Sequence, residues 1–507
     1  MEDQKLLVLD FGGQYKELIA RVVRELKVHS VVEPANIGLD KIKEINPVGI
    51  IFTGGPNSVY DPTSPRCDEG VFKLGVPILG ICYGMQYIAN YFGGKIEKAP
   101  VPEYGETNVS VSQNSEIFNG LSENQVMLMS HTDCVSAVPG GFKVTARTQN
   151  CVAAIECEEK KVYAVQFHPE VKRSENGAKV IENFLYRVCG VKGDYLLDDV
   201  IEKEIVKIKE KVKDGKVLLG LSGGVDSSVA AALIGKAVPG KLVCVYIDHG
   251  FMRKNETEEI KAAFKDMPIR LVVVDAKERF AAKLKGVTEP EQKRKIIGKE
   301  FVAAFAEESA KLGECDYLAQ GTIYPDVIES GAANSANIKS HHNVGGLPEN
   351  LPFKGLVEPL RGLFKDEVRK IGLKLGLPAA LVNRQPFPGP GLAVRIIGEL
   401  TPEKADILRD ADYIFRTELS AAGVKADQFF AVLTDTRSVG VIGDYRNYGY
   451  VVALRAVTTD DFMTARITEI PYAVLESASL KIVNEVKGVS RVVYDVTGKP
   501  PATIEWE

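Results

Sequence analysis

The sequence lacks the segments that direct a protein out of the cell or into a membrane. Its first residues, MEDQKLLVLDFGG, do not have the basic and then apolar pattern of a signal peptide. No apolar run approaches the ~20 residues that a helix needs to span a bilayer. The net charge is −5 and no arm is rich in lysine and arginine, which argues against nucleic acid as the main partner. We therefore expect a cytoplasmic protein with neither a membrane nor a nucleic-acid partner.

Two further kinds of site are missing at the level of sequence spacing. None of the eight cysteines forms a C-x-x-C pair, so the spacing predicts neither a zinc site nor a dithiol redox pair. Most of these cysteines are expected to be small buried apolar residues. The lysine-bearing phosphate loop G-x-x-x-x-G-K-[ST] is also absent, which excludes the usual nucleoside-triphosphate site.

The 507 residues that are present suffice for about three domains of ~150 residues each. Residues 1–190 contain the apolar runs LLVLD, GIIFTGG and VPILGIC, which end in glycine turns as buried parallel strands do. Residues 191–382 open with an amphipathic helix and continue with further strands of the parallel type. Residues 383–507 follow this with strands and a long helix but no repeated βαβ pattern. We expect two doubly wound α/β domains and a small C-terminal α+β domain.

Cys82 differs from the other cysteines because it stands between an apolar strand and a helix in LGICYGMQ. Glycines two residues away on either side permit a sharp turn, and the following helix N-terminus favours a thiolate. In YAVQFHPEV, His168 and Glu170 are two positions apart, so on an extended chain they share a face. The histidine could move a proton at the Cys82 sulfur while the carboxylate orients the ring. The alternatives are a structural cysteine and a capped histidine at a strand end.

Gly54 and Gly55 in FTGGPNS could present backbone N–H groups to an oxyanion, although this stretch taken alone favours a plain Gly-Pro turn. With G-x-C-x-G and HPE, the first segment resembles the class I glutamine amidotransferases. The resemblance implies that Cys82, His168 and Glu170 release ammonia from glutamine through a thioester. It also implies that the backbone amides of Gly55 and Tyr83 hold the oxyanion. Three departures from the family pattern concern the fit of glutamine only: Gly13 for serine, Thr132 for glycine, and the absence of a His-Thr pair after HPEV.

A second loop, SGGVDSS, lies between an apolar strand and an alanine-rich helix. Its N–H groups and hydroxyls would form a nest for a diphosphate. The loop resembles that of the N-type ATP pyrophosphatases, which implies cleavage between the α and β phosphates of ATP. The residues of the loop that we expect to bind ATP are Ser222, Gly223, Gly224, Val225, Asp226, Ser227 and Ser228. The alternative is a flexible Ser/Gly turn.

The missing positive charge is expected downstream, because RGLFKDEVRKIG resembles a later motif of the same family and points to Lys365. Magnesium is expected to accompany ATP. Asp226 either caps the helix or helps to bind this magnesium, and the ligands of the metal stay open. Asp248 and His249 lie either near the adenine or in a simple turn after their strand.

The third segment decides between possible acceptors of the ammonia. RQPFPGPGLAVR, RSVGVIGDYRNYGY, DFMTA and GKPPATIEWE resemble the C-terminal domain of the glutamine-hydrolysing GMP synthetases. The resemblance spans essentially the whole chain and implies conversion of XMP to GMP, with ATP cleaved to AMP and pyrophosphate. It implies a homodimer and contacts to XMP from Arg294, Asp444, Lys499 and Glu505. Gly389 and Gly391 could contact a phosphate, and residues 323–346 could form a lid over the nucleotide.

Three alternatives carry less weight. A kinase-type amidotransferase needs the lysine-bearing loop that is absent. An asparagine synthetase needs an N-terminal cysteine, and here Met1 is followed by Glu2. A regulatory binder that has lost its chemistry would be expected to lack the nucleophile or the base, yet both are present.

Overall fold

The computed structural model describes residues 4–329, 353–459, 462 and 464–507. The chain forms two compact units that divide after Val200, and each is described by itself. The lid predicted over residues 323–346 lies for the most part outside the described residues. Within the described ranges, no helix has the length and apolar character needed to cross a membrane.

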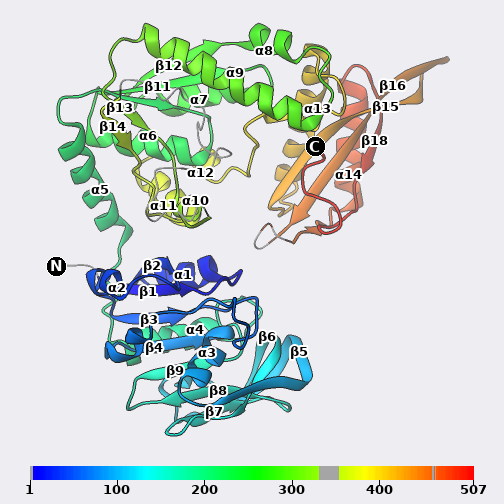
Figure 1. The fold of residues 1–507 in the computed structure, drawn as a ribbon. Helices are drawn as coiled ribbons and strands as arrows, with labels where there is room; N and C mark the ends of the chain where they lie inside the picture. The colour runs from blue at the N-terminus through cyan, green and yellow to red at the C-terminus, as the bar shows by residue number, and fades with distance from the viewer. Residues whose placement is uncertain (1–3, 330–352, 460–461, 463) are drawn as a thin grey trace. The chain divides into compact units, whose positions relative to one another are not determined.

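The first unit is built on a nine-stranded sheet with the order β2-β1-β3-β4-β9-β8-β7-β5-β6 (Figure 1). The first five strands in this order run parallel, and the remaining four extend the sheet in antiparallel fashion. The central parallel strands are fully buried, which explains their continuous apolar sequences. The strands are β1 (Lys5–Asp10), β2 (His29–Pro34), β3 (Gly49–Phe52), β4 (Ile78–Ile81), β5 (Lys95–Val111), β6 (Asn124–Ala137), β7 (Lys143–Arg147), β8 (Val152–Cys157) and β9 (Val162–Val165).

Short helices pack against this sheet through apolar faces. In α1, for example, Ile19, Ala20 and Val23 are buried, whereas Glu25 at the end of the helix is exposed. The helices are α1 (Lys16–Glu25), α2 (Leu39–Ile45), α3 (Tyr83–Tyr91) and α4 (Gly177–Asn183), with short turns η1 (Glu69–Lys73), η2 (Glu116–Phe118) and η3 (Phe184–Val188).

The second unit begins with a five-stranded, wholly parallel sheet of order β12-β11-β10-β13-β14. This sheet and that of the first unit confirm the expected α/β architecture. The strands are β10 (Val217–Gly220), β11 (Leu242–Asp248), β12 (Arg270–Asp275), β13 (Tyr317–Ala319) and β14 (Gly355–Val357). The helices are α5 (Leu197–Val212), α6 (Val225–Ala237), α7 (Glu256–Phe264), α8 (Lys277–Leu284), α9 (Pro290–Lys311), α10 (Tyr324–Glu329), α11 (Lys365–Lys374) and α12 (Ala379–Val382).

The C-terminal part adds a second sheet of α+β type, as expected. A long antiparallel pair, β15 and β16, is joined by two shorter strands, and two helices pack on it (Figure 1). The elements are η4 (Gly391–Arg395), α13 (Pro402–Ala421), β15 (Gln428–Ile442), β16 (Tyr445–Thr458), β17 (Arg466–Ile467), α14 (Tyr472–Glu485) and β18 (Val489–Tyr494).

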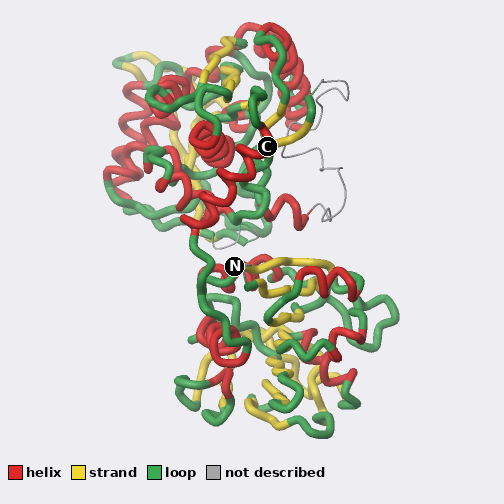
Figure 2. The backbone as a smooth tube through the Cα atoms, turned by 90° about the vertical axis from the view of Figure 1, so that its left-hand side faces the viewer, coloured by secondary structure: helices red, strands yellow, loops and turns green. Residues whose placement is uncertain are grey.

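One hydrophobic core runs through both sheets of the second unit. It extends from Leu218 in β10 through Phe280 and Leu392 to Val452 in β16. The division predicted between residues 382 and 383 therefore separates two sheets that share a core. In Figure 2, helices dominate the part of this unit around the parallel sheet.

Candidate active sites

Cys82 occupies a turn that joins β4 directly to α3. Its backbone lies at φ 53° and ψ −106°, a conformation that residues other than glycine rarely adopt. The two neighbouring glycines are required by close packing. A Cβ atom at Gly80 would lie 2.7 Å from the backbone of Gly84, and one at Gly84 would lie 2.6 Å from the Phe52 carbonyl oxygen. The turn therefore presents the sulfur at the carboxyl edge of the parallel strands.

His168 and Glu170 follow β9, the strand next to β4, and both are buried. The Nδ1 atom of His168 lies 2.7 Å from Oε1 of Glu170, and the Cys82 side chain lies near the other edge of the ring. Burial alone lowers the pKa of His168, but the charge and hydrogen bond of Glu170 and the nearby Cys82 thiol raise it well above its ordinary value. The structure thus brings together the three residues predicted for catalysis.

Gln166 is a neighbour of the sulfur that the sequence interpretation missed. Its Nε2 atom donates to the Cys82 sulfur at 3.6 Å, and the thiol donates to the Ser130 carbonyl oxygen at 3.8 Å. Gln166 precedes His168 by two positions, so strand alternation carried the signal for it.

The two predicted oxyanion residues lie side by side. A Cβ atom at Gly55 would be 3.0 Å from the Tyr83 ring, and one at Gly54 would be 3.4 Å from the His168 ring. Gly13, which departs from the family pattern, packs under this turn. A Cβ atom there would meet the Gly54 carbonyl oxygen at 2.5 Å, so a serine would displace the loop.

A second buried histidine lies on β6, next to the residue whose carbonyl accepts from Cys82. The Nε2 atom of His131 is 3.1 Å from Oε2 of Glu103, the residue opposite it on β5. Burial lowers the pKa of His131 despite the adjacent carboxylate, so the ring favours its neutral form.

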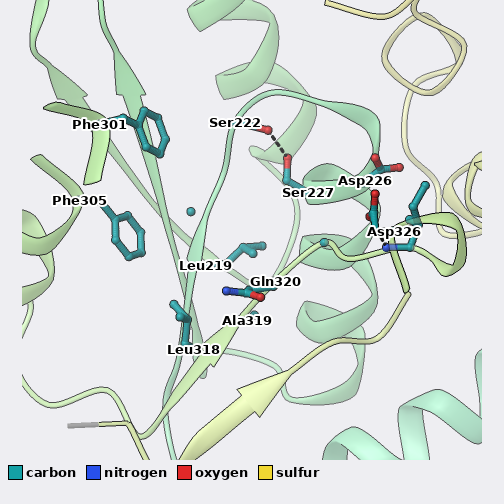
Figure 3. Close-up of a pocket in the computed structure, with 13 residues that line it drawn as sticks. Leu219, Ser222, Asp226, Ser227, Phe301, Phe305, Leu318, Ala319, Gln320 and Asp326 are labelled. Atoms are coloured by element: carbon teal, nitrogen blue, oxygen red, sulfur yellow. Dashed lines mark hydrogen bonds between the residues drawn. The ribbon is translucent and has the colours of Figure 1, made fainter. Parts of the chain in front are cut away.

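The SGGVDSS loop connects β10 to α6, as expected. Gly223 has a positive φ of 74°, which a side chain would oppose, and α6 begins at Val225. Ser222 and Ser227 are joined by a hydrogen bond of 3.1 Å between their hydroxyls (Figure 3). The Ser228 hydroxyl is buried, and no partner for it occurs among the described residues. A hydroxyl without a partner beside a helix N-terminus is suited to an anionic ligand.

A pocket opens beside this loop, between β10 and β13. Strand order reverses at this point, which is where open α/β sheets bind ligands. Figure 3 shows Asp226 and Asp326 on one side of the pocket, with Phe301 and Phe305 across from them. The pocket thus has an apolar aromatic end and a polar end.

Lys365, predicted to supply a positive charge, begins α11 and reaches the loop. Its Nζ atom donates to both Asp226 oxygens, at 2.7 and 2.6 Å. Arg384 was not predicted, yet it donates to the Gly223 carbonyl oxygen at 2.5 Å and to the buried Glu256 carboxylate. Both cations come from more than a hundred residues downstream, so local patterns give little sign of them.

Three of the four residues predicted to bind XMP contact other parts of the second unit. Arg294 donates to the Glu507 carbonyl oxygen, and Glu505 accepts from Arg395 at 2.7 and 3.0 Å. Lys499 donates to the Phe462 carbonyl oxygen at 2.7 Å. Asp444 is exposed in the turn between β15 and β16.

The structure also locates Gly389 and Gly391, predicted to contact a phosphate, and Asp248 and His249, predicted near the adenine or in a turn. A Cβ atom at Gly391 would meet the Phe251 carbonyl oxygen at 2.2 Å, so packing alone requires glycine there. Gly389 has open space around it. Asp248 and His249 line a second pocket, and this pocket shares no lining residue with the pocket beside the loop.

Three family models match the chain in the order of the predicted segments. The glutamine amidotransferase class-I model matches residues 7–188, the NAD synthase model residues 197–304, and the GMP synthase C terminal domain model residues 417–506.

Curated relatives match over the whole length. A glutamine-hydrolyzing GMP synthase of Clostridium botulinum (strain Alaska E43 / Type E3) is 58% identical over 100% of both chains. Proteins of the same name from Acetivibrio thermocellus and Finegoldia magna are 59% and 56% identical, again over 100% of both chains.

Proposed function

The chain belongs to the glutamine-hydrolysing GMP synthases, and from this premise we propose how its reaction is divided between the two sites. The enzyme uses glutamine and ATP to make GMP. In the proposed division, residues 1–200 release ammonia from glutamine, and residues 201–507 activate XMP and aminate it. The grouping of Cys82 with the hydrogen-bonded pair His168 and Glu170 at the carboxyl edge of the first sheet carries this proposal.

In the first site, the Cys82 sulfur attacks the side-chain amide carbon of glutamine. His168 takes the thiol proton and returns it to the leaving nitrogen, so that ammonia departs and a thioester remains. Water then cleaves the thioester to glutamate and regenerates the thiol. Glu170 holds the ring in orientation, and the backbone N–H groups of Gly55 and Tyr83 stabilise the oxyanion.

In the second site, ATP binds with its adenine toward Phe301 and Phe305 and its phosphates on residues 222–228. The polar and aromatic ends of the pocket support this orientation. The carbonyl oxygen of XMP attacks the α-phosphorus, and pyrophosphate leaves into the nest of loop N–H groups beside Lys365. Ammonia then displaces AMP from the activated XMP, which yields GMP.

Magnesium fits the polar end of this pocket. Asp226 and Asp326 both line it. Mg²⁺ is commonly bound by one or two carboxylates together with the phosphate oxygens of a nucleotide. When bound, the ion would neutralise charge on the phosphates. Asp226 would then exchange part of its contact with Lys365 for the metal.

The contacts to XMP are proposed for Arg294, Asp444, Lys499 and Glu505. Arg294 contacts Glu507, two residues beyond Glu505 in the C-terminal tail, which supports a common site for Arg294 and Glu505. Removal of either side chain is expected to raise KM for XMP more than KM for ATP.

We also propose that the enzyme is a cytoplasmic homodimer. The exposed apolar side chains of Val439, Val441, Tyr445 and Tyr448 on the β15–β16 pair would suit contact with a second copy. Light scattering of the purified chain tests this, and a monomeric mass at working concentration would contradict it.

Product analysis with Cys82→Ala tests the division of the reaction. The variant should make no GMP from glutamine but should keep the wild-type rate with ammonia, with AMP and pyrophosphate as the other products. Cys67→Ala removes another buried thiol of the first unit and should keep both activities. Loss of the ammonia-dependent reaction in Cys82→Ala would contradict the division, and ADP as a product would contradict the interpretation of the loop.

A further inference from the structure

Glu103, His131 and Cys151 form a cluster of possible metal ligands that the proposed reaction does not use. One ligand atom from each lies within 4.8 Å of the other two. All three residues are buried, with 6%, 5% and 6% of their surface exposed. Their sequence spacing gives no metal motif, because they come from two strands and a loop.

Strand register assembles this cluster. Glu103 and His131 are directly opposite each other on β5 and β6, and Cys151 immediately precedes β8. The pairing of β5 and β6 is irregular between Lys98 and Glu103, and beyond this irregularity Cys134 of β6 also turns inward. Its side chain packs in the same small cluster as that of Cys151. A second sulfur therefore lies near Cys151 but outside the group of three ligands.

The chemistry of these ligands favours zinc over magnesium or calcium. Imidazole, thiolate and carboxylate are the usual zinc ligands, whereas magnesium and calcium bind oxygen almost alone. Tetrahedral zinc would place its ligand atoms roughly 3.3–3.8 Å apart, given its bond lengths. The Glu103–His131 pair at 3.1 Å and the 4.8 Å limit of the cluster bracket this spacing.

The buried carboxylate in the cluster also favours a bound cation. Glu103 is a buried carboxylate whose hydrogen-bond partners are His131 and the Asn150 amide. A buried carboxylate is costly unless a cation offsets it. A divalent ion would supply that charge, and each coordinated thiol would release its proton to solvent.

From this geometry we propose that Glu103, His131 and Cys151 bind one zinc ion in the first unit. The site is separate from Cys82 but shares β6 with it, because the carbonyl oxygens of Leu128 and Ser130 contact His168 and Cys82. A metal there would fix the strand against which the nucleophile rests. This inference does not depend on the proposed function.

Cobalt binding to the full chain tests the proposal. Because Cys82 and His168 could bind metals themselves, all measurements use Cys82→Ala. We expect one Co²⁺ per chain with a thiolate-to-cobalt charge-transfer band, displaced by Zn²⁺. Adding Cys151→Ser should weaken binding by about tenfold or more. Adding Cys67→Ser, which changes a buried thiol elsewhere in the unit, should leave it unchanged.

Equal cobalt affinity in the Cys151→Ser and Cys67→Ser variants would overturn the proposal, as would the absence of a charge-transfer band in Cys82→Ala alone. Circular dichroism establishes whether each variant is folded. If Cys151→Ser does not fold, Glu103→Gln takes its place, since it keeps the shape of the side chain. Unchanged cobalt affinity in that variant would equally overturn the site.

Discussion

At the scale of single residues, Glu170 sets the charge of His168. The carboxylate 2.7 Å away raises the pKa of the ring, whereas burial opposes protonation. In Glu170→Gln the charge is lost and burial remains, so the pKa of His168 should fall below its ordinary value. We expect glutamine-dependent activity to fall by at least about tenfold, since proton transfer by a positioned base contributes 10²–10⁴-fold. Ammonia-dependent GMP formation should not change.

The same substitution makes a prediction about stability and pH. Because the folded wild type raises the pKa of His168, the resulting stabilisation is complete below the unfolded value of about 6.5 and is lost as pH rises through the folded value. The unfolding temperature of the first unit should therefore differ most between wild type and Glu170→Gln near pH 6. A calorimetric difference that grew toward alkaline pH would contradict this assignment of charge.

At the scale of elements, the turn at Cys82 depends on the contact of α3 with β3. Gly84→Ala would place a methyl group 2.6 Å from the Phe52 carbonyl oxygen and 2.8 Å from the Phe52 Cβ. We expect it to lower the free energy of unfolding of the first unit by at least about 2 kcal/mol. Gly140→Ala is the matched control, because nothing lies within 4 Å of the added atom. Urea unfolding compares the two, and equal stability would show that the helix shifts freely.

The start of α11 allows a test of the nucleotide site. Lys365→Met keeps most of the side-chain volume but removes the charge that reaches Asp226. KM for ATP should rise by about tenfold or more, as expected for a lost charged hydrogen bond of 1.5–3 kcal/mol. Lys370→Met, on the same helix and more exposed, should have little effect. Glutaminase activity without nucleotides should be the same in both variants.

The secondary-structure elements show which features of the fold and sites could be predicted from the sequence. The turn at Cys82 and the loop at residues 222–228 were predictable because strand, turn and helix follow one another directly. The pairs Lys365–Asp226 and Arg384–Gly223 were harder, since only the tertiary fold brings them together. The antiparallel strands β5 to β8 were not foreseen, and the cluster at Glu103 depends on their register. The predicted residue roles stay predictions until the variants are measured.

At the scale of the whole molecule, the stability of the second unit depends on a carboxylate near the C-terminus. Arg395 is fully buried and its guanidinium is held by Glu505. Glu505→Gln would leave that cation without its countercharge and should destabilise the second unit by about 3 kcal/mol. The exposed Glu485→Gln should change stability by less than about 0.5 kcal/mol.

Tryptophan fluorescence measures this effect cleanly, because Trp506 is the single tryptophan of the chain and lies in the second unit. Glutaminase activity reports the first unit independently. If Glu505→Gln and Glu485→Gln unfold at the same urea concentration, the buried pair contributes no net stability.

The continuous core of residues 201–507 has a consequence for how the gene could be divided. A cut between the codons of Leu196 and Leu197, just before α5, would keep Val191 and Tyr195 with the first unit and would leave the apolar clusters of both units whole. A cut at residue 382 would instead part Leu218 and Phe280 from Leu392 and Val452, and both fragments would expose apolar surface. The amide-hydrolysing half could thus be exchanged between organisms as a separate gene, whereas the nucleotide-activating half would be inherited only in one piece.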